Sequence, residues 1–156
     1  MVCGERVADS TQYIIPELNF FCDGTVTQWK VGLEGGGSGQ SVNLQIWRSV
    51  GAGEYTSVTE VVYTKTIADE RIASVPVSMS VMAGDMVGFY VPGVQLEPHT
   101  LPDVGLTMYT TGGSPASSLS SLSSVVGPSP YISVVFGECF LHECHVSTIQ
   151  WQYYSI

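Results

Sequence analysis

The sequence has no long hydrophobic run and few positive charges. No segment reaches the about 18 consecutive apolar residues of a membrane helix, and charged residues occur near the start, where a signal peptide would have its apolar core. We therefore expect this chain to be soluble, with no membrane insertion and with any signal or anchor outside it. Lys and Arg total 5 against 14 Asp and Glu, a formal net charge of −9. Scattered cations form no basic patch, which disfavours nucleic acid as a partner.

Helical patterns are also missing, since no stretch of ordinary helix length repeats apolar residues three or four positions apart. Charged residues make up 12% of the chain, whereas Gly alone numbers 17 and Ser and Thr are abundant. This balance is typical of a β-rich extracellular or cell-surface module. A length of 156 residues fits one domain with a real core, so we expect residues 1–156 to form a single domain.

The stretch Ala73–Gly93 carries the strongest pattern. Apolar residues recur at every second position over Val75–Val81, which is the period of a strand with one buried face. The residues Ala83–Asp85 tolerate turn dihedrals, and the alternation then resumes. We predict a hairpin in which Phe89 faces the core and Tyr90 points away from it.

Similar alternation predicts further short strands, separated by turn residues. The fold class is then all-β, an antiparallel β-sandwich of about eight or nine strands, jelly-roll-like because the Cys…Trp…Cys spacing of an immunoglobulin domain is missing. We expect a polar N-terminal arm at residues 1–12 and a Ser-rich, mobile loop with little internal structure at residues 112–130. The remaining predicted strands are Tyr13–Cys22, Thr25–Leu33, Val42–Arg48, Glu60–Thr66, Val104–Tyr109 and Tyr131–Phe136. The first is broken at Pro16 on a sheet edge, Thr27 and Trp29 point inward, and Val134 and Phe136 share one face. Trp47 is out of phase with its strand, and it is either buried on a second covered face or exposed as a recognition platform. The segment Val146–Ile156 is either a final strand or the start of a linker.

Four cysteines lie near the two ends of the chain: Cys3, Cys22, Cys139 and Cys144. An even count in an acidic β-rich chain indicates two disulfide bonds. Of the three possible connectivities we favour Cys3 with Cys22 and Cys139 with Cys144. Four free buried thiols in a reducing compartment are the alternative.

Four segments taken in order resemble a known kind of module: Ile15–Gly24, Leu44–Arg48, Ala83–Tyr90 and Ile132–Val134. Together they are similar to an uncharacterised family of extracellular, jelly-roll-like β modules in predicted cell-surface proteins of sponges and other early-branching animals. The resemblance implies a secreted or membrane-tethered ectodomain beside other modules. It brings no catalytic residues.

A cluster of thiols and imidazoles near the C-terminus is the densest group of candidate ligands. Cys139, His142, Cys144 and His145 have the chemistry of a zinc site. Four ligands this close in sequence have little freedom to reach one ion, so we favour a disulfide over a metal here.

Signals for catalysis or for a cofactor are weak. The chain has no G-x-S-x-G motif and no phosphate-binding Gly loop followed by a helix, and its histidines lie in predicted loops. We therefore expect no enzyme activity and no cofactor. Asp23, Asp85 and Asp103 leave a Ca²⁺ site as a minor possibility.

These observations favour a non-catalytic extracellular recognition or adhesion module, a receptor ectodomain for instance, that binds a protein or glycan through its loops. The alternative is a carbohydrate-binding or glycan-processing jelly roll with Trp47, Tyr90 and Tyr109 as sugar-stacking aromatics. An exposed row of these aromatics would favour the alternative, and their burial would argue against it.

Overall fold

The computed structural model describes residues 11–32, 38–92, 101–113, 116–129, 132–137 and 147–149. The described residues form eleven strands and contain no helix, and so no helix that could cross a membrane. The all-β prediction is confirmed. The strands are β1 (Thr11–Asn19), β2 (Gly24–Gly32), β3 (Ser41–Gly51), β4 (Glu54–Thr64), β5 (Ile72–Val81), β6 (Met86–Val91), β7 (Leu101–Gly112), β8 (Ser118–Leu119), β9 (Ser123–Ser129), β10 (Ile132–Gly137) and β11 (Ser147–Ile149).

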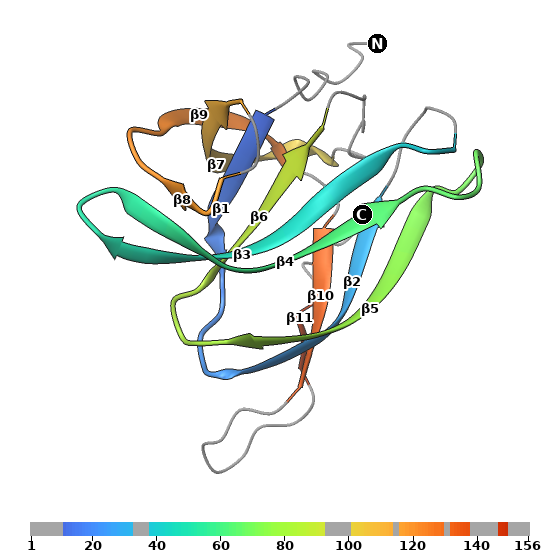
Figure 1. Ribbon diagram of the computed structural model, residues 1–156, viewed down its shortest axis with the longest axis horizontal. Coiled ribbons are helices and arrows are strands. Elements are labelled where there is room, and N and C mark those ends of the chain that lie inside the picture. Colours follow the sequence, from blue (N-terminus) through green and yellow to red (C-terminus); the bar gives the residue numbers. More distant parts are fainter. Residues whose placement is uncertain are drawn as a thin grey trace.

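The strands form two antiparallel sheets (Figure 1). The larger sheet has seven strands in the order β8-β4-β3-β6-β1-β7-β9, and the smaller has four in the order β11-β10-β2-β5. The first strand pairs with β6 and β7. Two sheets of seven and four strands differ from the predicted jelly roll, which has eight strands in two sheets.

One large apolar cluster, called here the main core, is built from both sheets. It includes Leu44 and Phe89 from the seven-stranded sheet and Trp29 and Phe136 from the four-stranded sheet. The rings of Tyr13 and Phe89 stack with their centroids 4.7 Å apart. Because side chains alternate along a strand, every second residue of these strands enters the main core. The predicted inward direction of Trp29 is confirmed.

The seven-stranded sheet is curled (Figure 1), and its other face carries a second, smaller core. Its two outermost strands, β8 and β9, are joined by a short connection, so the chain passes directly from one edge of the sheet to the other. We call residues 116–122 the strap. Leu119 of the strap is buried against Ile14, Trp47 and Met86.

The predicted central hairpin is wrong, although the phase of its strands is right. β5 belongs to the four-stranded sheet and β6 to the seven-stranded sheet, so the turn between them is an arch from one sheet to the other. Val75, Met79 and Val81 are buried and the serines between them are exposed, as predicted. Every residue of β6 is buried, because β6 lies inside a sheet with both faces covered.

β1 also differs from its prediction. It lies between β6 and β7 rather than at an edge. Pro16, which has no N–H to donate, falls where the register between β1 and β6 shifts after Ile15, and such a bulge tolerates proline. In β2 a second register shift, between Val26 and Gln28, turns Val26 inward and leaves Thr27 exposed, contrary to the predicted phase.

The Ser-rich segment 112–130 is not a structureless loop. It contains β8, which pairs with β4, and β9, which pairs with β7 from Ser123 to Ser129. The predicted arm at residues 1–12 also loses its last two positions, because Thr11 and Gln12 start β1.

Candidate functional site

The three aromatic residues predicted to stack on a sugar do not form an exposed platform. Trp47 is 0% exposed and Tyr90 is 5% exposed. Tyr109 is half-buried, and its ring centroid lies 5.9 Å from that of Tyr55 beside the second core. An aromatic ring must present a free face to stack on a sugar, so Trp47 and Tyr90 are unavailable for this role.

Trp47 is held instead by a network of neutral amides. Its indole Nε1 donates to Oε1 of Gln45 at 3.0 Å, and Nε2 of Gln12 donates to the same oxygen at 2.5 Å. Nε2 of Gln45 donates to Oε2 of Glu60 at 2.6 Å. Amides do not titrate, and the one carboxylate in the network, that of Glu60, belongs to an exposed residue, so this network has the chemistry of a structural support rather than of an acid–base pair.

Gly88 of β6 lies directly under the Trp47 ring. A Cβ at this position would lie 2.5 Å from Cδ1 of Trp47 and 2.6 Å from the backbone oxygen of Tyr13. Trp47 therefore fits against the sheet only because residue 88 has no side chain.

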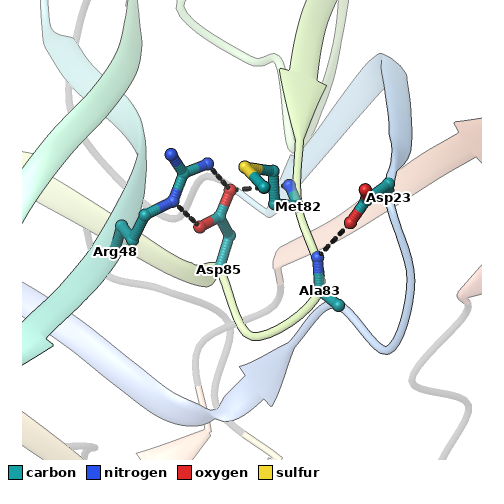
Figure 2. A network of polar contacts seen from close by, with 5 residues as sticks. All are labelled: Asp23, Arg48, Met82, Ala83 and Asp85. Atoms are coloured by element: carbon teal, nitrogen blue, oxygen red, sulfur yellow. Dashed lines mark hydrogen bonds and ion pairs between the residues drawn. The ribbon is translucent and has the colours of Figure 1, made fainter.

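The arch between β5 and β6 is held by an ion pair between the buried Asp85 and the partly exposed Arg48 (Figure 2). Nε and a terminal nitrogen of Arg48 donate to the two carboxylate oxygens of Asp85 at 2.7 and 2.8 Å. The Met82 N–H donates to Oδ2 of Asp85 at 2.8 Å, and the Ala83 N–H donates to Oδ1 of Asp23 at 2.8 Å. The hydrogen bond to Asp85 raises the pKa of Arg48.

These contacts bear on the predicted Ca²⁺ ligands. Both carboxylate oxygens of Asp85 already face a guanidinium group, which occupies the positions a cation would need. Asp23 accepts a backbone N–H, and the side chain of Asp103 lies outside the described residues. In the part of the chain that the structure describes, no three candidate metal ligands come together.

Cys22 is disulfide-bonded. Cys3, Cys139 and Cys144 lie outside the described residues, so the predicted pairings stay predictions. The alternative zinc ligands, which add His142 and His145, also lie outside them.

The outer edge of β9 is the feature that best fits a binding site. β9 ends the seven-stranded sheet, and along the sheet its pairing partner is β7. Val126 is 75% exposed and Val125 is 39% exposed. An edge strand presents unpaired backbone N–H and C=O groups, which can template pairing with another strand.

The other edge strands described are shorter, or they carry a proline or a charge that opposes pairing with an added strand. β8 has two residues and β11 has three. β5 carries Pro76 in its middle, which cannot donate to an added strand. The part of β4 beyond β8 carries the exposed charge of Glu60. Charge, proline and short length are the usual protections of an edge. β9 has seven residues and no charge, and its proline, Pro128, lies near its C-terminal end rather than in its middle.

The prediction from sequence missed this edge because it assigned residues 112–130 to a loop. The available signal was the β-branched pair Val125-Val126, followed by Gly127-Pro128 as a stop. Two valines between serines give no alternating pattern long enough to identify a strand.

Comparisons with known proteins identify no family for this chain. No family model, no curated protein and no solved structure matches the chain.

Proposed function

We propose that the protein is a non-catalytic recognition or adhesion module that binds an extended segment of a partner protein by strand addition at β9. The observation that carries the proposal is an uncharged edge strand with two exposed valines. Strand addition takes affinity from backbone hydrogen bonds and specificity from alternate side chains. The binding element is then a strand of the scaffold rather than the loops predicted from the sequence.

The two valines give the edge an apolar surface on both sides. Val125 lies opposite Met108 of the main core, and Val126 lies opposite Thr107. Directly paired residues point to the same face of a sheet, so Val125 and Val126 point to opposite faces. An added strand would cover both.

We place this module outside the cell or on its surface. The support is the even number of cysteines, the bonded state of Cys22 and the low content of charged residues. The resemblance to cell-surface modules agrees with this placement. The carbohydrate-binding alternative has no specific observation in its favour once Trp47 and Tyr90 are buried.

Selection of displayed peptides tests the proposal. A library of random extended peptides of about ten residues, the upper end of strand length, is selected against the purified protein and against Val126→Lys. We expect uncharged peptides with alternating apolar residues to be enriched on the wild type and lost on Val126→Lys, because a lysine on an edge opposes pairing.

The matched control is Val62→Lys, which introduces the same charge at a 54% exposed valine of β4. This variant should select the same peptides as the wild type. Equal enrichment on the wild type and Val126→Lys would place binding elsewhere, and no enrichment on a wild type that is monomeric would contradict strand addition.

A further inference from the structure

The chain around β9 carries no charge over an unusually long distance. No Asp, Glu, Lys, Arg or His occurs between Asp103 and Glu138, although the whole chain has a formal net charge of −9. This interval contains β8, β9 and β10 and most of β7. β9 itself therefore places no carboxylate against an approaching molecule, and the Glu17 carboxylate, which accepts from the Thr107 N–H, belongs to the neighbouring strands β1 and β7.

We propose that the occupant of the β9 edge is a second copy of this chain, paired antiparallel with β9 about a two-fold axis. This inference rests on the proposed function and names the partner. A two-fold contact uses the same surface on both copies, so it closes at a dimer. With the pairing centred on Val125, Val125 meets Val125 of the second copy and Val126 lies opposite a serine. No charges of β9 are opposed, and the seven-stranded sheets of the two copies become continuous.

The edge chemistry favours a copy over a partner of opposite charge. A strand that selects cationic partners needs carboxylates beside the seam, and the sequence Ser-Ser-Val-Val-Gly at residues 123–127 supplies none. Self-pairing of this sequence brings no like charges together, and its small side chains leave room for the second strand. Antiparallel pairing centred on Val125 also leaves Pro128 outside the central ladder of the seam.

Sedimentation velocity over a range of protein concentrations tests the inference on the full chain. We expect the wild type to reach about twofold the monomer mass, as a closed two-fold dimer requires. Val126→Lys should remain a monomer, and Val62→Lys should behave as the wild type. Both valines are exposed, so the fold should survive both changes, which far-UV circular dichroism and thermal melts verify.

Hydrogen exchange at low and high protein concentration locates the contact. In the wild type the amides of residues 123–127 should become more protected as the concentration rises, and in Val126→Lys they should not. A dimer that Val62→Lys abolishes and Val126→Lys leaves intact would overturn the inference in favour of the β4 edge.

The outcome also separates this inference from the proposed function. A wild type that stays monomeric at every concentration overturns the second copy as the occupant. If selected peptides still bind that monomer and Val126→Lys abolishes their binding, the edge is a recognition site for another protein. If no peptide binds either, both proposals fail.

Discussion

At the scale of single residues, the strictest requirement in the described structure is the contact between Gly88 and Trp47. Gly88→Ala would place a Cβ within 2.5 Å of the indole and 2.6 Å of a backbone oxygen. The indole is fully buried, so it has no free space to move into. We expect a loss of about 1–3 kcal/mol of unfolding free energy, the usual cost of overpacking a core. Urea unfolding followed by circular dichroism measures it.

Gly112→Ala is the matched control for this prediction. Gly112 is also a strand glycine, but a Cβ there meets no atom within 4 Å. Its unfolding free energy should stay close to that of the wild type. Equal stability of the two variants would show that Trp47 can leave its place over residue 88.

Tyr63 should make stability sensitive to alkaline pH. Its hydroxyl donates to Glu70, and partial burial together with this carboxylate raises the pKa of Tyr63 to about 12. An unfolded tyrosine titrates near pH 10. The stabilising contribution is therefore complete below about pH 10, declines as the pH rises toward about 12, and is absent above that.

We expect the stability of Tyr63→Phe to fall less than that of the wild type over this range. Phenylalanine neither ionises nor bonds to Glu70, so the variant should also be less stable at neutral pH, by about 1 kcal/mol. Thermal melts at pH values from neutral to strongly alkaline make the comparison. Parallel pH curves for the two proteins would exclude Tyr63 as the source of the alkaline sensitivity.

At the scale of elements, the arch between β5 and β6 depends on Arg48. Asp85 is buried, and Arg48→Ala would leave its carboxylate without a counter-ion (Figure 2). Removing one partner of a buried pair costs about 3–5 kcal/mol. Because the side chain of Arg48 is 37% exposed, water can replace part of the interaction, and we expect the lower end of this range. Chemical denaturation gives the value.

The double variant Arg48→Ala, Asp85→Asn provides the control. Replacing the carboxylate removes the unpaired charge, so the second change should cost much less in the Arg48→Ala background than alone. Additive losses would mean that the two side chains do not stabilise the arch as a pair.

The strand β6 gives the clearest contrast between expectation from sequence and structure. Alternation alone predicts that Phe89→Ala is costly and that Tyr90→Ala is mild. In the structure Phe89 is 4% exposed and Tyr90 is 5% exposed, because both faces of β6 are covered. We now expect both variants to lose about 3–5 kcal/mol, as for other buried aromatics. Thermal melts of the two variants side by side decide between the expectations, and a mild Tyr90 effect would show that its face of β6 is open.

Local sequence predicted which way side chains point better than it predicted which strands pair. The period of two in β5 and β10 fixes their buried faces whatever their partners, so Met79, Val134 and Phe136 were assigned correctly. The same period does not say whether the strand after a turn folds back beside its neighbour or crosses to another sheet. Between β5 and β6 the chain crosses to the other sheet, and the arch there is held by Asp85 and Arg48, which are distant in sequence.

The candidate site was missed for a related reason. Serines dominate the segment that contains β8 and β9, and its strands are formed by pairing with β4 and β7 rather than by their own alternation. Likewise, the burial of Trp47 involves the strap, which was not predicted from the sequence. Alternation does not decide whether Trp47 is buried or exposed, and in the structure Trp47 is buried in the second core together with Leu119 of the strap.

At the scale of the whole molecule, the net charge opposes the proposed dimer while the β9 seam is neutral. Two copies that each carry a formal charge of −9 repel one another over long range. Salt shortens that range from about 30 Å at 0.01 M to about 8 Å at 0.15 M. A seam built from backbone hydrogen bonds and valines has no ion pairs for salt to weaken, so screening should act mainly on the repulsion.

We therefore expect added NaCl to strengthen dimerisation of the wild type. The dimer fraction at fixed protein concentration should rise from low to physiological ionic strength, because only the unfavourable term is screened. Sedimentation velocity at several salt concentrations measures this, with Val126→Lys expected to stay monomeric throughout. A dimer that dissociates as salt is added would mean that ion pairs hold the copies together, and the interface would then lie on the charged part of the surface rather than along β9.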